Sequence, residues 1–278
     1  MRVGDSPLCV PRGGNGLLRV GVQPAPERSL RRWGYGVASL DAALGGGVAY
    51  GRVHEFYAAE SEDIAAAAGF VLPLVTVMAE SEVGSGRPAL WLRSRRAVRQ
   101  AGVVQANGWT ELGGRPDNCL FAMIADAKEL LKAAVDGLRS GALGAVVVET
   151  QGSLPELDLT ASRRLALAAE KSGTTLFLLR NGTEPVPSAA ETRWRVAAAP
   201  SRALPANAPG APVFDIELLR QRSGPSGLRW QLEWDRDRRI FMEADAGALV
   251  SLPARGSPAA AGAGPVRPEA KEAIQRAA

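Results

Sequence analysis

The 278-residue chain has few lysines, one histidine and two cysteines, and each scarcity excludes a class of function. Cys9 and Cys119 lie far apart without Cys-x-x-Cys spacing or a histidine partner, so we expect free thiols and no metal site. His54 has no nucleophile motif beside it, so we expect a structural role for this histidine. Basic charge is carried mainly by arginine, because the lysines are only Lys128, Lys132, Lys171 and Lys271.

The sequence also lacks the apolar core of a secretory signal peptide, and no apolar run approaches the roughly 20 residues that cross a bilayer. The hydrophobic fraction of 46% is enough for a large core. A net charge of +4 and a pI near 9.4 permit contact with nucleic acid or an acidic partner without requiring it. We therefore expect a cytoplasmic protein without membrane contact.

Composition divides the chain into three parts. Residues 1–32 are rich in Gly, Pro and Arg, so we expect a basic, disordered leader, with a binding arm that orders on a partner as the alternative. Residues 33–250 form the expected folded core. Residues 251–278 form an Ala/Gly/Pro linker that ends in a helix-prone peptide at 269–276, too short to be a stable helix alone.

Helical and strand patterns alternate from residue 51 to residue 179, which predicts an α/β fold with a parallel sheet flanked by helices. The expected strands are 53–57, 89–92, 118–122, 145–149 and 174–179, and the expected helices are 39–44, with Ser39 as N-cap, 64–80, 95–108, 125–140 and 160–172. Period-two alternation then predicts an antiparallel extension of the sheet edge that ends in a hairpin. Its strands are expected at 193–197, 214–219, 230–234 and 239–242.

The stretch 51–64 has the context of a phosphate-binding loop without the residues of one. A strand, a loop and an apolar helix follow one another, and in this arrangement a P-loop places glycines and a lysine. The loop has neither. Glu60, Glu62 and Asp63 instead place three carboxylates at a helix N-terminus, where the helix dipole favours an anion. We therefore predict that a protein carboxylate occupies the place of a nucleotide phosphate and that no cofactor binds.

The order of elements resembles the RecA-like fold, and three stretches carry the resemblance. The stretch from Ser39-Leu40-Asp41 to Gly51-Arg52-Val53 looks like the beginning of a RecA core, and the degenerate loop follows it. The strand 146–149 occupies the Walker B position, with Glu149 where an aspartate is usual. The strand ending at Leu92 is followed by Arg93 where RecA has the glutamate that activates water. The residues of the degenerate loop are Ala58, Glu60, Ser61, Glu62, Asp63 and Ile64.

Together with Trp33-Gly34 and the Trp230–Trp234 hairpin, these features are similar to the ImuA family over roughly residues 33–245. ImuA proteins are RecA-like, SulA-related members of the bacterial inducible mutagenesis cassette. The resemblance implies a non-catalytic accessory protein in SOS-induced, error-prone translesion DNA synthesis. The alternatives are a SulA-type cell-division inhibitor, which is expected to be shorter and without long tails, and a divergent RecA-family ATPase.

The resemblance also implies partners and a place in the cell. The implied partners are an ImuB-type Y-family polymerase homologue that lacks activity, RecA, and, indirectly, an error-prone polymerase of the replicative type. The protein is expected at the nucleoid when damage induces it. A homodimer and direct contact with DNA are left open.

Two stretches are the candidate interaction segments, a basic one after the strand at 89–92 and the helix-prone peptide at the C-terminus. We expect the first to form ion pairs with the acidic loop, and a grip on phosphates or on an acidic protein is the alternative. If the pairing is right, charge reversal there destabilises the domain. The candidate residues are Arg93, Arg95, Arg96, Arg99, Glu269, Lys271, Ile274 and Arg276.

Three further residues have alternative roles. Glu149 lies at a strand end, where α/β sheets bind ligands, but it has no phosphate cradle or metal partner in the sequence, so we do not favour a role as general base. Trp230 and Trp234 lie four apart and share one strand face. We expect them to pack in the core, with an exposed stacking platform as the alternative.

Overall fold

The computed structural model describes residues 30–208 and 210–244. Most of the expected leader lies outside these residues, as do Cys9, the end of the expected core at 245–250 and the C-terminal segment 251–278. The proposed interaction residues of that segment, which are Glu269, Lys271, Ile274 and Arg276, are outside the described residues too.

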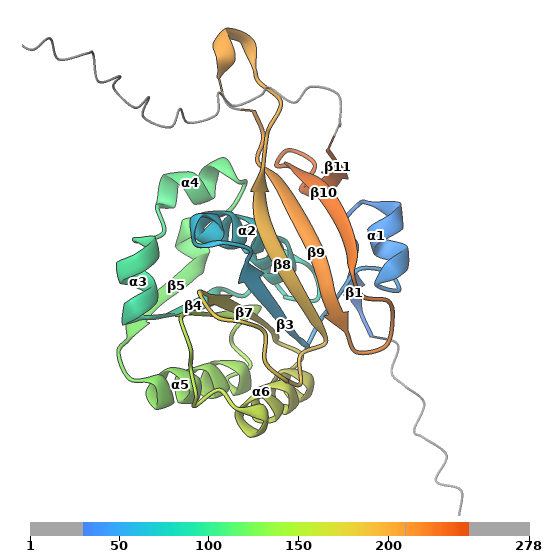
Figure 1. Ribbon diagram of the computed structural model, residues 1–278. Helices are drawn as coiled ribbons and strands as arrows, with labels where there is room; N and C mark the ends of the chain where they lie inside the picture. Colours follow the sequence, from blue (N-terminus) through green and yellow to red (C-terminus); the bar gives the residue numbers. More distant parts are fainter. Residues whose placement is uncertain (1–29, 209, 245–278) are drawn as a thin grey trace, which may run out of the picture.

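A nine-stranded sheet forms the centre of the described part, in the order β11-β10-β9-β8-β3-β7-β6-β4-β5 (Figure 1). All pairings from β8 to β5 are parallel, and those from β8 to β11 are antiparallel, which confirms a parallel core with an antiparallel extension. The strand at 193–197, predicted as the first of the extension, belongs to the parallel core instead, because β8 pairs parallel with β3. The parallel strands are β3 (Val53–Ala58), β4 (Ala89–Ser94), β5 (Cys119–Ile124), β6 (Ala145–Gln151), β7 (Thr175–Asn181) and β8 (Thr192–Ala199). The extension consists of β9 (Val213–Gln221), β10 (Leu228–Asp235) and β11 (Ile240–Glu243), and β1 (Arg32–Trp33) pairs separately with β2 (Val48–Ala49).

Helices cover both faces of the parallel strands because each strand buries side chains on its two sides. The α-helices are α1 (Ala38–Ala43), α2 (Ile64–Glu80), α3 (Arg95–Ala101), α4 (Ala106–Glu111), α5 (Ala127–Arg139) and α6 (Leu159–Ser172), and the 3₁₀ turns are η1 (Ser61–Asp63), η2 (Pro116–Asn118) and η3 (Pro205–Asn207). Figure 1 shows α5 and α6 on one face and α2 on the other. Each face has its own apolar cluster, so the sheet lies between two cores.

Three local predictions were wrong. The segment 95–108 is two helices, because Gly102 takes a φ of 72° and ends α3. Ser39 lies inside α1 rather than at its N-cap, which is Val37. The segment Ser61–Glu80 is 20 residues long with a mean hydropathy of 1.6, so one helix does reach the length and composition of a membrane span. This segment is largely buried in the described fold, as is typical of a core helix.

The aromatic side chains of the extension pack inward, as predicted. Trp234 is buried and its ring lies 4.8 Å from that of Phe241, centroid to centroid. Trp230 is partly buried against the same cluster, and its Nε1 donates to Ser39 Oγ at 3.1 Å. The extension therefore completes the core on the α2 side of the sheet.

Candidate functional site

The candidate site lies at the carboxyl ends of the parallel strands, where an open α/β sheet binds ligands. The loop from β3 to α2 reaches this edge. It is short and tied down on both sides: Ala59 N donates to Val196 O of β8 at 2.8 Å, and η1 leads directly into α2. The loop that would hold a phosphate is therefore pinned to the neighbouring strand.

Asp63 holds the loop in this conformation. Its Oδ2 accepts from Glu60 N at 3.2 Å, and the two residues form a capping box, in which each side chain accepts from the other residue's backbone. Its Oδ1 accepts from Ala198 N of β8 at 2.8 Å. A protein carboxylate thus accepts from one backbone N–H group of the loop and one of β8. That it occupies the place of a nucleotide phosphate stays a prediction.

Glu149 at the Walker B position is held by two side chains of the adjacent strand β4. Arg93 donates from Nε to Oε2 and from Nη2 to Oε1, both at 2.8 Å, and Trp91 Nε1 donates to Oε2 at 2.9 Å. Glu149 and Arg93 face each other in the register of the two strands, and both are buried. Each carboxylate oxygen therefore has a fixed donor, and the negative charge is balanced inside the protein.

Arg93 also connects this pair to the chain that follows α3. Its Nη1 donates to Gly102 O at 2.6 Å, so one guanidinium fixes both the carboxylate and the turn between α3 and α4. The prediction that these arginines form ion pairs with the acidic loop was wrong. Arg93 pairs with Glu149, and within the described residues Arg95, Arg96 and Arg99 form no ion pair with the loop.

A second buried ion pair lies beside the loop and was not foreseen from the sequence. Arg193 Nε of β8 donates to Glu55 Oε2 of β3 at 2.8 Å, and its Nη2 donates to Ser188 Oγ at 2.9 Å. On the other side, Arg180 Nη1 donates to the Tyr57 hydroxyl at 3.1 Å, and its guanidinium lies over the Tyr57 ring. The only hint in the sequence was charged residues within otherwise apolar strands.

His54 has the structural role expected of it. Its Nε2 lies 2.9 Å from Ala49 O, and because a carbonyl only accepts, Nε2 carries the proton. Its Nδ1 then accepts from Thr192 Oγ1 at 2.7 Å, and that hydroxyl in turn accepts from Trp194 Nε1. Burial lowers the pKa of His54 to about 4, and the bond to Ala49 offsets only part of this effect.

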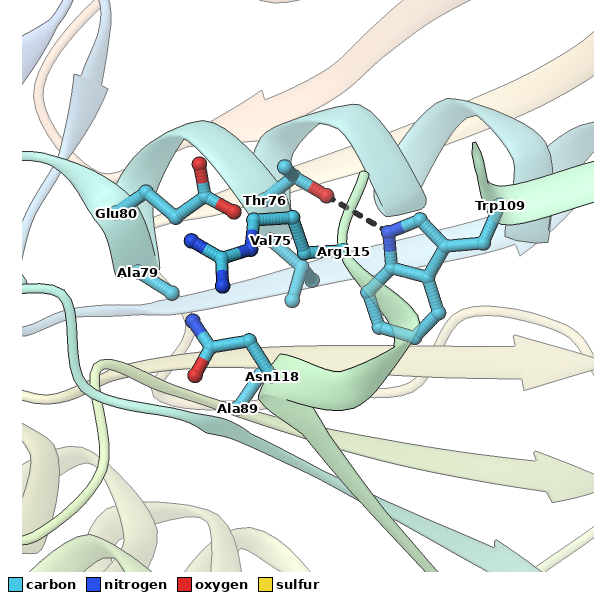
Figure 2. A pocket seen from close by; sticks show the side chains of 8 residues that line it. All are labelled: Val75, Thr76, Ala79, Glu80, Ala89, Trp109, Arg115 and Asn118. Carbon is cyan, nitrogen blue, oxygen red and sulfur yellow. Dashed lines mark hydrogen bonds between the residues drawn. The ribbon is translucent and has the colours of Figure 1, made fainter. Parts of the chain in front are cut away.

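Three remaining features of the described residues offer no alternative site. Among the described residues no group of three or more His, Cys, Asp or Glu side chains could hold a metal ion. A cavity of about 10 Å³ lies against α2, with Glu80, Arg115 and Asn118 around it, and Trp109 Nε1 donates to Thr76 Oγ1 at its wall (Figure 2). That volume holds about one water molecule. Cys119 is a free thiol, as expected, and burial raises its pKa to about 12.

These residues do not fit a nucleotide and its metal ion. A phosphate needs backbone N–H groups or a cation directed at it, but Asp63 occupies the N–H groups of Glu60 and Ala198. A magnesium ion needs a carboxylate with a free oxygen, but Arg93 and Trp91 engage both oxygens of Glu149.

The strand order, with β3 between β8 and β7 and with helices on both faces, defines a RecA-like α/β protein. The crystal structure of the RadB recombinase is similar at 15% identity and a TM-score of 0.48, over 76% of this chain and 99% of that chain. At this level of likeness the class rests on the strand order itself. No protein-family model matches the chain.

Sequence comparison gives the family. The chain is 33% identical over 207 residues to "Protein ImuA" of Caulobacter vibrioides strain NA1000 / CB15N, which covers 69% of this chain and 80% of that protein. "Protein ImuA" of strain ATCC 19089 / CIP 103742 / CB 15 matches to the same extent. The chain belongs to the ImuA family.

Proposed function

We propose that the protein is a non-catalytic accessory protein in SOS-induced, error-prone translesion DNA synthesis, and that it acts by protein–protein interaction. The observation that carries this proposal is membership of the ImuA family. The proposed partners are an ImuB-type inactive Y-family polymerase homologue, RecA and, through the first, an error-prone polymerase of the replicative type. The proposed place of action is the nucleoid in the cytoplasm of damaged cells.

The non-catalytic part of the proposal is supported by the chemistry of the candidate site. Glu149 would have to give up Arg93 before it could bind a metal ion or activate a water molecule. Leaving one member of a buried ion pair without its partner costs about 3–5 kcal/mol. A catalytic cycle that frees Glu149 would include this cost each time. A rigid, internally neutralised edge is better suited to a scaffold that presents surfaces to other proteins.

A pull-down from cells treated with a DNA-damaging agent tests the proposal. Tagged full-length protein is compared with a chain ended at Pro253, and bound proteins are identified by mass spectrometry. We expect recovery of the inactive polymerase homologue and RecA, and loss of either on truncation would place its docking element in the C-terminal segment. Recovery of a tubulin-like division protein in their place would favour the SulA-type alternative, and recovery of none of these proteins would contradict the proposal.

A further inference from the structure

The two edges of the nine-stranded sheet differ in how they are protected. At one edge, the short strand β11 is covered by the segment around α1: Phe241 N donates to Tyr35 O at 2.7 Å, and Ser39 Oγ donates to Glu243 Oε1 at 3.0 Å. Covering an edge in this way satisfies its open backbone groups and prevents pairing with other chains.

At the other edge, β5 has none of these protections. In the described part of the chain β5 pairs with β4 alone, so one side of its backbone faces outward. Its sequence, Cys-Leu-Phe-Ala-Met-Ile, contains no charged residue and no proline, the two kinds of residue that commonly block edge pairing. Leu120, Phe121 and Met123 are 57%, 46% and 56% exposed. An uncharged, apolar, open edge of this kind is a template for an added strand.

The exposed side chains of β5 lie on both faces of the sheet, since alternate residues of a strand point to opposite sides. Ala122 packs with the cluster beneath α5, and Leu120 shares its face. Phe121 lies on the other face against Trp91 and Trp109, and Met123 shares that face. A strand added to β5 would therefore bury apolar side chains above and below the sheet.

A basic rim borders this edge. Helix α3 contacts β5 and lies beside it in Figure 1. It exposes Arg95, Arg96 and Arg99, none of which forms an ion pair within the described residues. A segment with carboxylates next to its apolar residues would therefore gain attraction at the rim as well as backbone hydrogen bonds.

Charge disfavours the other candidates for this edge. If two copies paired through antiparallel β5 strands, the rim of each would face the start of the other's β5, where Arg115 and Asp117 already neutralise each other. The segments 1–29 and 245–278 of the chain itself each carry more basic than acidic residues. Neither a second copy of β5 nor the terminal segments of the chain therefore bring net negative charge to the arginines of α3.

We propose that the β5 edge binds an extended apolar segment with acidic flanking residues from a partner protein, which adds as a strand beside the α3 arginines. This inference deepens the proposed function and rests on it for the existence of a protein partner. Leu120 and Met123 supply the apolar contacts, and Arg95 and Arg99 supply the charge.

Photocrosslinking tests this directly. A photoreactive phenylalanine derivative replaces Met123 in the full-length protein in damage-treated cells, and the crosslinked peptide is identified by mass spectrometry. The control carries the same group in place of Leu167, which is 66% exposed on α6. We expect a crosslink at residue 123 to an apolar segment of another protein with Asp or Glu beside it. A crosslink to a second copy, a crosslink to this chain's own terminal segments, or a yield no higher than that of the control would overturn the proposal.

Substitutions in the probe-carrying protein separate the apolar and the charged contributions. Leu120→Ser should lower the crosslink yield about tenfold, and Arg95→Glu with Arg99→Glu about fivefold. The matched controls Leu167→Ser and Arg163→Glu, both on α6, should leave the yield unchanged. Equal effects of test and control variants would contradict the proposed contacts.

The two experiments fail independently. A residue-123 crosslink to a division protein would support the edge proposal and contradict the proposed function. Recovery of the polymerase homologue without a residue-123 crosslink would contradict the edge proposal alone.

Discussion

Arg93 and Glu149 face each other on neighbouring parallel strands and are joined by two hydrogen bonds of 2.8 Å. The pair lies at the carboxyl edge of the sheet, where a RecA-like ATPase is expected to expose its catalytic carboxylates. The arginine that follows β4's apolar residues thus neutralises the carboxylate of β6. At this edge the carboxylate of Glu149 is therefore bonded within the protein.

Removal of one member of this pair should be costly. Arg93→Gln leaves Glu149 buried without its charged partner, so we expect the free energy of unfolding to fall by about 3–5 kcal/mol in urea denaturation. Arg93→Met combined with Glu149→Leu should cost much less than the sum of the two single changes, because no unpaired charge is then buried.

The matched control is charge reversal of the neighbouring exposed arginines. Arg95→Glu with Arg96→Glu should change the free energy of unfolding by no more than about 0.5 kcal/mol per substitution. If these changes destabilise the protein as much as Arg93→Gln does, the Glu149 pair is not what distinguishes Arg93 from the exposed arginines.

Asp63 should matter more than its acidic neighbours. Asp63→Ala removes the acceptor of the Glu60 and Ala198 N–H groups, and we expect a loss of about 1–2 kcal/mol in the free energy of unfolding. Glu62→Ala is the control, because Glu62 is exposed and, in the described part of the chain, its side chain accepts from Ser61 alone. Equal stability of the two variants would show that Asp63 does not hold the loop.

His54 should make stability depend on pH in the acid range. Its pKa is 6.5 when unperturbed and about 4 in the fold, so between these values the unfolded chain binds a proton that the folded protein does not. This contribution to stability is complete above pH 6.5 and is lost as the pH falls towards 4, by about 3 kcal/mol in total.

Urea denaturation at pH 7 and pH 4.5 measures this effect. Carboxylates also titrate in this range, so the readout is the difference between wild type and His54→Gln. The variant should be less stable at pH 7 and should lose less stability on acidification. Parallel losses in the two proteins would contradict a buried, neutral His54.

The fold was largely predictable because its parallel strands are short apolar runs separated by amphipathic helices, as 145–151 and 127–139 illustrate. The break at Gly102 was missed because a single glycine within a helical pattern does not reveal its φ. Of the candidate site, only the absence of lysine and glycine from the loop was visible in the sequence.

The partner of Arg93 was not predictable from spacing. Arg93 and Glu149 are 56 positions apart, and their pairing depends on the register of β4 against β6. Arg93 pairs with Glu149 rather than with the acidic loop because β4 lies next to β6. Which strands are adjacent is a property of the whole sheet. The open edge at β5 likewise depends on the strand order.

Isothermal titration of the full-length protein with Mg²⁺–ATP tests the central claim most directly. We expect no saturable heat at micromolar to millimolar nucleotide and no phosphate release above the buffer rate, for wild type and Asp63→Ala alike. Saturable binding in the micromolar range would contradict the claim that this edge is closed to nucleotides, and would favour the divergent ATPase.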